Sequence, residues 1–394
     1  MFCSLIKEYE SAMIQDLQKF IRIDSIEDKK KVNMPFGQKV NDALEFVLNK
    51  GDEFGFKTKN VDGYAGYVEI GSGEHLIGIL GHVDVVPSGS GWAYPPFEGV
   101  IVDNKIYGRG AIDNKGPIIS ALYSMKILSE NNMVNEGNRI RLIIGTAEET
   151  SWEGIRHYVN NEEIPNVSFT PDANFPVIHG EKGLLDFDLN MHFKNKISEN
   201  EISVLSIDGG ESRNMVPSKS MARLFVPPKK MKEFLNKIEE YNNKYIAKIK
   251  AIFDPDSVKL LIDGKAAHGS TPEKGINAIS YMILFLNSLN IKDGDKSKFL
   301  EHYSSLIGIE YDGMSLNCNF HDVLSGNLTL NIGTIRLKDN HVKLECNLRY
   351  PISVNYDNIK HNLNLKLKNT SLEYFEYEHL EPIFFSKSDS MVKN

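Results

Sequence analysis

The motif Gly81-His82-Val83-Asp84 pairs an imidazole with a carboxylate, a combination that can serve a metal site. Residues two apart project to the same side of an extended chain, so Asp84 is placed to orient His82. A ligating imidazole usually donates its other N–H to such a carboxylate, which fixes its tautomer. Taken alone, the pair equally describes a surface histidine beside a solvated aspartate.

Three further motifs add carboxylates. Asp113 lies in the glycine-rich turn 108–116, Glu148 and Glu149 directly follow an apolar run, and Asp172 lies in the segment TPDA. Neighbouring strand residues point to opposite sides, so one glutamate can bind a metal while the other faces a substrate. Each motif has an ordinary interpretation as a loop, a hydrated strand edge or a turn. All four follow predicted strands of one α/β region, where ligands bind in open sheets, so the set predicts a functional site.

The composition narrows the class of protein and the choice of ligands. A length of 394 residues predicts two or three domains, and 41% hydrophobic with 25% charged residues is typical of a globular protein. The net charge of −8 is not gathered into a basic stripe, so no nucleic acid is expected as a partner. Cys3, Cys318 and Cys346 lack zinc-knuckle spacing, so a metal site must use imidazole and carboxylate.

The chain carries no apolar run near the roughly 18 residues needed to span a bilayer. Its N-terminus, MFCSLIKEYE, has charges where a signal peptide has its apolar core. We therefore expect no membrane partner and a cytoplasmic location.

The first half of the sequence predicts an α/β domain. Helical spacing indicates helices within 5–21 and 40–48, and a third in which Pro117 occupies the first turn. The runs 67–70 and 76–80, separated by the turn Gly71-Ser72-Gly73, predict a hairpin or meander, and GVIVDNKIYG predicts a second hairpin. The nearly all-apolar strand 141–146 is typical of one covered on both faces by helices.

From residue 184 the pattern changes to strict alternation, which is the signature of a strand with one wet face. Helix-like stretches at roughly 229–249, 275–290 and 355–366 are interleaved with alternating strands such as HVKLECNLRY and LEYFEYE. This order predicts an α+β domain over 184–379, inserted into a first domain of residues 1–183. Residues 380–394 are expected to begin the return to that first domain.

Seven motifs now resemble one family along the whole chain. GHVDVVP, GRGAIDNKGP, AEET, PDANFPVIHGEKG, GGESRNMVP, AAHGSTPEKGINA and NLRYP are similar to the co-catalytic zinc aminopeptidase, deacylase and dipeptidase superfamily, and within it to the PepV-like dipeptidases. The resemblance implies a catalytic domain with a mixed, mainly parallel sheet flanked by helices, 1–183. It also implies an inserted α+β, ferredoxin-like lid domain, 184–379.

The resemblance implies a two-zinc site and a role for each acidic residue. His82 and Asp172 would hold one Zn²⁺, Asp113 would bridge, and Glu149 would hold the second. Glu148 would be the general base acting with a hydroxide that bridges the metals, with Asp84 orienting His82. Mn²⁺ and Co²⁺ accept the same ligands, so they stay open.

Three residues of the inserted domain match family positions that contact the substrate. His268 would stabilise the oxyanion, and Asn214 and Arg349 would bind the oxyanion or the substrate's carboxylate. The segment 270–273 after His268 resembles a helix N-terminal cap. Without the family context, His268 is as well described as an exposed histidine before a helix, and Arg349 as part of a surface ion pair.

The sequence departs from the family's pattern near residue 394. The family brings a final histidine to the second zinc, and no histidine follows His379 here. We therefore expect a truncated or split member whose second zinc has only Asp113 and Glu149 and binds weakly. A complementing chain, a homodimer or a loss of activity are the expected consequences.

The function predicted from these residues is zinc-dependent hydrolysis of dipeptides or short peptides. One alternative is an N-acyl amino acid deacylase of the same superfamily. An alternative of another class is a non-catalytic homologue that binds a peptide, a metal or a complementing chain.

Overall fold

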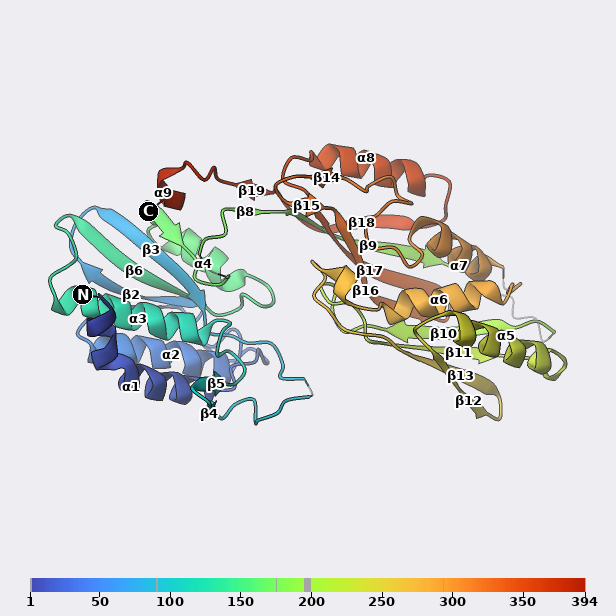
Figure 1. Cartoon of the computed structure of the whole chain (residues 1–394), viewed down its shortest axis with the longest axis horizontal. Coiled ribbons are helices and arrows are strands. Elements are labelled where there is room, and N and C mark those ends of the chain that lie inside the picture. Colours follow the sequence, from blue (N-terminus) through green and yellow to red (C-terminus); the bar gives the residue numbers. More distant parts are fainter. Residues whose placement is uncertain (1, 90, 175, 195–199, 293, 394) are drawn as a thin grey trace. The chain divides into compact units, whose positions relative to one another are not determined.

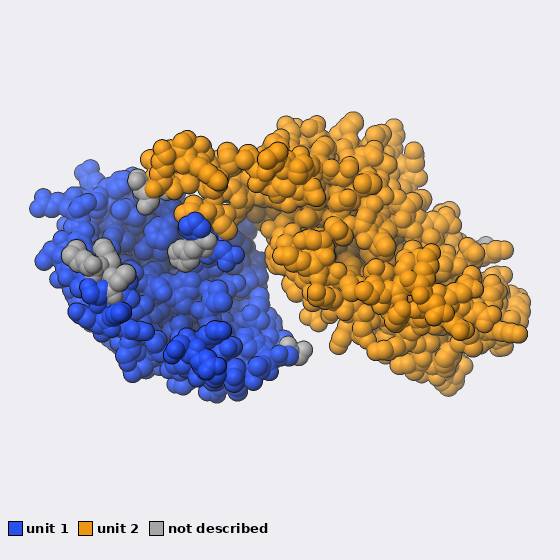
Figure 2. Space-filling model, in the orientation of Figure 1, with its two compact units in different colours: residues 1–176 blue, residues 177–394 orange. Residues whose placement is uncertain are grey.

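The computed structural model describes residues 2–89, 91–174, 176–194, 200–292 and 294–393. They form two compact units, Met1–Pro176 (unit 1) and Val177–Asn394 (unit 2), shown in different colours in Figure 2. The α/β class with a mixed sheet is confirmed, whereas the domain limits 183/184 and 379/380 stay predictions. In the described residues, no helix is both long and apolar enough to cross a membrane.

Unit 1 is built on a five-stranded sheet in the order β1-β2-β6-β3-β7. Its strands are β1 (Lys57–Val61), β2 (Ala65–Gly71), β3 (His75–His82), β6 (Asn138–Gly145) and β7 (Val167–Phe169). β3 runs parallel to β6 and β7, whereas β2 runs antiparallel to both β1 and β6. The sheet is therefore mixed, but parallel pairings make up half of it and not the expected majority.

The predicted hairpin of β2 and β3 is wrong. The strands follow one another in the chain, but β6 lies between them and pairs with both. Local alternation and a glycine-rich turn identify two strands without saying which strands pair. The predicted hairpin at GVIVDNKIYG is confirmed as β4 (Val100–Val102) and β5 (Lys105–Tyr107).

Helices cover both faces of β6, as its apolar sequence predicts (Figure 1). The helices of unit 1 are α1 (Phe2–Ile21), α2 (Gln38–Glu53), α3 (Lys115–Glu130) and α4 (Glu153–Asn161). Leu142 and Ile144 belong to the core under α2 and α3, while Ile143 packs in a second core with Tyr158 of α4. α3 contains Pro117 in its first turn, as expected.

Unit 2 carries an eight-stranded antiparallel sheet in the order β12-β13-β11-β10-β16-β17-β9-β18. Its strands are β9 (Gly183–His192), β10 (Ser203–Gly209), β11 (Lys219–Phe225), β12 (Ile249–Asp254), β13 (Ser257–Asp263), β16 (Thr329–Lys338), β17 (His341–Tyr350) and β18 (Glu373–Leu380). Burial alternates along β9, so the one-sided strand predicted from the sequence is confirmed. One face of this sheet is apolar and the other is polar.

The apolar face packs against helices of unit 2 (Figure 1). These are α5 (Met231–Lys244), α6 (Ala278–Ser288), α7 (Asp295–Leu306) and α8 (Tyr356–Leu367), of which α7 was not predicted. The expected helix cap at 270–273 is wrong, because only a 3₁₀ turn, Pro272–Lys274, follows it. The cap is Asn277, whose Oδ1 accepts the backbone N–H groups of Ile279 and Ser280 at 3.1 and 3.2 Å.

Short elements complete unit 2. β8 (Gly180–Glu181) pairs with β19 (Ile383–Phe384), so the segment entering unit 2 lies beside the segment near residue 384. β14 (His321–Asp322) pairs with β15 (Gly326–Asn327), and α9 spans Ser390–Lys393.

Replacing Leu344 tests the core of unit 2. Leu344 is 0% exposed in the middle of β17, so Leu344→Ala should lower the free energy of unfolding by about 2–5 kcal/mol through lost burial and a residual cavity. Urea unfolding monitored by circular dichroism measures it. Leu365→Ala is the matched control, because Leu365 is 55% exposed on α8 and should change little. Equal effects of the two changes would contradict this core.

Candidate metal centre

His82 is the last residue of β3, and its buried imidazole faces a group of carboxylates. Its Nδ1 lies 3.0 Å from the backbone oxygen of Asp84 and 3.4 Å from Oδ1 of the same residue. An Nδ1–H that donates to this carbonyl leaves the lone pair of Nε2 free. Nε2 is therefore the atom presented to a metal.

Carboxylates from three segments surround this Nε2. The nearest oxygens are Oδ1 of Asp113 at 2.9 Å, Oδ2 of Asp172 at 3.4 Å and Oε2 of Glu148 at 3.9 Å. The ligand atoms of His82, Asp113 and Glu149 all lie within 4.8 Å of one another, as do those of His82, Glu148 and Asp172. One imidazole and several carboxylates at this spacing fit the donor set that divalent zinc accepts.

The parallel strands explain why these residues meet. β3, β6 and β7 run in the same direction, so their carboxyl ends share one edge of the sheet. His82 ends β3, Glu148 and Glu149 follow β6, and Asp172 follows β7. Ligand sites in open sheets form at this edge.

Asp84 links the imidazole to the glutamate segment. Its carboxylate is almost fully buried and accepts the backbone N–H of Glu148 at 3.2 Å and that of Glu149 at 3.0 Å. Hydrogen bonds to a buried carboxylate fix the segment that donates them. Asp84 therefore holds both glutamates beside His82 and not only the imidazole itself.

Asn114 is a site residue that the sequence analysis did not identify. It is fully buried, and its Nδ2 donates to Oδ1 of Asp172 at 2.7 Å and to the backbone oxygen of Pro171 at 3.2 Å. These bonds orient one carboxylate of the group from the start of α3. The only signal in the sequence was its place directly after Asp113.

Crowding of acidic groups shifts the pKa values of the site. Burial, and then the charges of neighbouring carboxylates, raise the pKa of Glu148 to about 7 and that of Glu149 to about 7, although the charge of His82 opposes both shifts. Burial opposes protonation of His82, but hydrogen bonds to Asp113, Asp172 and Asp84 outweigh it and raise its pKa. The site favours extra positive charge, which a divalent cation can supply.

A cavity of about 840 Å³ in unit 1 reaches this group. Asp113 and Asp172 line it together with apolar side chains such as Ile79, Ile112 and Phe169. The carboxylates are thus accessible from a partly apolar space.

The other three predicted residues, Asn214, His268 and Arg349, lie in unit 2. The backbone N–H of Gly269 donates to the oxygen of Asn214 at 2.6 Å, which joins the loop of Asn214 to that of His268. Burial, and then the charge of Arg349, lower the pKa of His268, which favours its neutral form. These residues belong to one part of unit 2.

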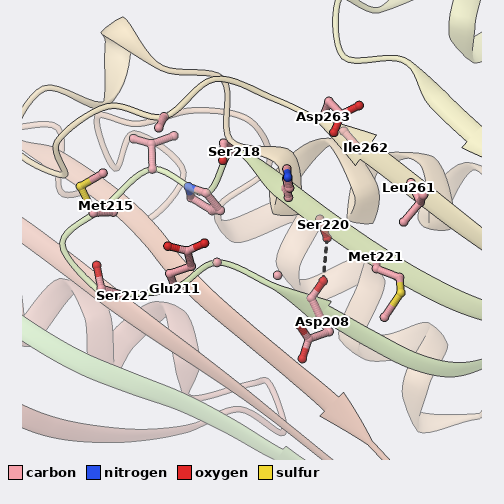
Figure 3. Close-up of a pocket in the computed structure, with 16 residues that line it drawn as sticks. Asp208, Glu211, Ser212, Met215, Ser218, Ser220, Met221, Leu261, Ile262 and Asp263 are labelled. Carbon is pink, nitrogen blue, oxygen red and sulfur yellow. Dashed lines mark hydrogen bonds between the residues drawn. The ribbon is translucent and has the colours of Figure 1, made fainter. Parts of the chain in front are cut away.

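A cavity of about 490 Å³ is lined by residues on either side of Asn214, among them Ser212 and Met215 (Figure 3). Met215 and Met221 line it, and so do three carboxylates, Asp208, Glu211 and Asp263. The sequence analysis did not predict this cavity.

Comparison with known sequences identifies relatives of the chain. Residues 78–390 match the model of the peptidase family M20/M25/M40. A Staphylococcus epidermidis protein named "Putative dipeptidase" is 36% identical over 395 residues, which cover 98% of this chain and 83% of the relative. The Bacillus subtilis protein named "Putative dipeptidase YtjP" is 35% identical over 384 residues, 97% of this chain and 81% of the relative.

Solved structures share the fold at low sequence identity. The dipeptidase Dug1p from Saccharomyces cerevisiae has a TM-score of 0.53 at 14% identity, covering 99% of this chain and 81% of that chain. The M20 family metallo-carboxypeptidase Sso-CP2 from Sulfolobus solfataricus has a TM-score of 0.51 at 16% identity, covering 97% and 81%.

Replacing Asn114 tests whether it supports Asp172 as a candidate metal ligand. Asn114→Ala removes the donor to Oδ1 of Asp172 and should weaken zinc binding about tenfold to a hundredfold, as is typical when a partner of a metal ligand is lost. Competition with a chromogenic chelator measures the affinity. Asn131→Ala, at the other end of α3, is the control. Unchanged affinity in Asn114→Ala would show that the contact does not serve metal binding.

Proposed function

We propose, since the chain belongs to peptidase family M20/M25/M40, that it is a zinc-dependent dipeptidase acting on dipeptides or short peptides. The observation that carries this proposal is the convergence of His82 with carboxylates from three other segments of the chain. The names of the sequence relatives support the choice of substrate class. Among the described residues, the groups around His82 are those in which an imidazole and at least two carboxylates come within ligand distance of one another.

The two groups of ligand atoms suggest how two cations would be held. His82 and Asp172 would bind one, Asp113 would bridge, and Glu149 would bind the other. Two zinc ions bound there polarise the scissile carbonyl and acidify a water molecule. Among the described residues, Asp113 and Glu149 are the ones proposed for the second position.

Glu148 is the general base in this proposal. Its carboxylate can accept a proton from a water molecule and pass it to the leaving amine. Its backbone is fixed by Asp84, and its Oε2 lies 3.9 Å from Nε2 of His82. The proton carrier is thus held at the edge of the ligand group.

Residues of unit 2 would bind the rest of the substrate. A neutral His268 donates one N–H to an oxyanion, and Asn214 offers an amide N–H₂ from the loop joined to it. Arg349 grips a carboxylate through its two-pronged guanidinium. These roles are carried by the family resemblance and by the neighbourhood of the three side chains.

Replacing Glu148 separates catalysis from metal binding. Glu148→Gln keeps the shape but removes the proton acceptor, so kcat should fall about 10²–10⁴-fold with zinc content unchanged. Steady-state hydrolysis of Ala-Leu and metal analysis of the same sample provide the two readouts. Glu153→Gln, in the exposed first turn of α4, is the control. A wild-type rate in Glu148→Gln would remove this residue from the mechanism.

Substrate comparison tests the function itself. The 394-residue chain, saturated with zinc, is assayed with dipeptides and with N-acetyl and N-succinyl amino acids. We expect faster turnover of the dipeptides. Faster turnover of the acylated compounds would identify a deacylase, and no turnover of either would favour a protein that only binds its ligand.

A further inference from the structure

The polar face of the unit 2 sheet is organised in rows across three strands. In one row Arg349 of β17 lies between Thr329 of β16 and Leu184 of β9. In the next row Asn347 lies between Asn331 and Asp186. Rows are about 7 Å apart along a strand, so side chains of successive rows are neighbours.

Arg213 pairs with the acidic residues of this face. Its guanidinium lies 2.8 Å from Oδ1 of Asp188, 3.6 Å from Oδ2 of Asp186 and 3.6 Å from Oε1 of Glu345. Lys343 adds contacts of 3.0 Å to Asp188 and 3.1 Å to Glu345. These three carboxylates are therefore already paired with Arg213 or Lys343.

Arg349 is left without such a partner. It is partly buried and forms no ion pair with a described residue, and its Nε lies 3.5 Å from Oδ1 of Asn347. Asp186, in the neighbouring row, already has partners for both carboxylate oxygens. Nδ2 of Asn347 donates to its Oδ1 at 2.6 Å, and Arg213 faces its Oδ2. A guanidinium in this setting has unused donors.

Lys182 is a second cation in the same situation. It lies between β8 and β9, two residues before the Leu184 that pairs with Arg349. Its ammonium donates to the backbone oxygen of Asn327. Asn327 lies two residues before Thr329, the residue of β16 that pairs with Arg349. Within the described part of the chain, Lys182 has no ion-pair partner either.

The pKa of Lys182 agrees with this placement. Burial lowers it, the charges of Asp322 and Glu273 oppose that shift, and the smaller effect of Arg349 adds to it. Two partly buried cations that repel one another are unfavourable unless an anion joins them.

We propose that Lys182 and Arg349 together bind the free carboxylate of the substrate, an assignment that rests on the proposed peptidase function. The oxyanion residues are adjacent, because Gly269, next to His268, packs against Asn347 in the neighbouring row. A carboxylate bound at Arg349 would lie about one row of the sheet from the oxyanion residues. This separation suits a substrate with a single residue after the scissile bond. Lys182 thus helps to select dipeptides over longer chains.

The cavity of Figure 3 is a poor alternative for the carboxylate. Asp208, Glu211 and Asp263 line it, so an anion would meet like charge there. Arg336 and Lys250 lie against two of these carboxylates at 3.3 and 2.7 Å, and Lys219, which also lines the cavity, lies near enough to Asp263 to lower its pKa.

The test compares a carboxylate with an amide. Wild type, Lys182→Met and Lys182→Arg are titrated by calorimetry with the phosphinic analogue of Ala-Leu, which cannot be hydrolysed, in its C-terminal carboxylate and amide forms. Lys182→Met should bind the carboxylate form about tenfold to a hundredfold more weakly, the loss of one charged hydrogen bond, with little change for the amide. Lys182→Arg should restore most of the affinity. Lys250→Met, an exposed lysine of β12 paired with Asp263, is the matched control.

Turnover of Ala-Leu, measured in parallel, keeps the two proposals separate. The assignment is supported if the wild type binds the carboxylate form better than the amide and Lys182→Met loses that preference. This holds even if no hydrolysis occurs. Hydrolysis of Ala-Leu by the wild type with an unchanged preference in Lys182→Met overturns the role of Lys182 and leaves the proposed function standing. Equal binding of both forms by the wild type overturns the carboxylate site as a whole.

Discussion

Repulsion among buried carboxylates is the constraint on which the site depends. Asp84, Asp113, Glu148, Glu149 and Asp172 converge on a single imidazole, and burial together with this crowding raises the pKa of both glutamates. Protons relieve it partly, and divalent cations relieve it more completely. The fold holds these groups together although they repel one another, which is the arrangement expected of a site built for cations.

The sheet of unit 1 supplies the rigidity for this arrangement. Parallel β3, β6 and β7 end at one edge, and cores on both faces of β6 fix the strands in place. Asp84 then ties the glutamate segment to β3, and Asn114 ties Asp172 to α3. In unit 2 the charge left over is positive. Arg213 pairs with acidic groups of the sheet, whereas Arg349 and Lys182 form no ion pair with a described residue, which is why we propose that they bind an anion.

The sequence predicted best what depends on local pattern. Alternation along β9 and the apolar run in β6 gave the correct burial, and the motifs at strand ends identified the residues that converge. Strand pairing depends on contacts between distant parts of the chain, so the sequence did not predict that β6 lies between β2 and β3. α7 was missed because Lys296 lies in its buried stripe, where its ammonium donates to the oxygen of Val204 at 2.6 Å and hides the helical period. Asn114 and Lys182 were missed because their partners are 58 and 145 residues away along the chain.

Anomalous diffraction at the zinc edge, from crystals of the chain grown with zinc, tests the central claim most directly. We expect a strong peak between Nε2 of His82 and the carboxylates of Asp113 and Asp172, and a second peak at Asp113 and Glu149. Zinc found only elsewhere on the chain, or no zinc at His82 under saturating conditions, would contradict it.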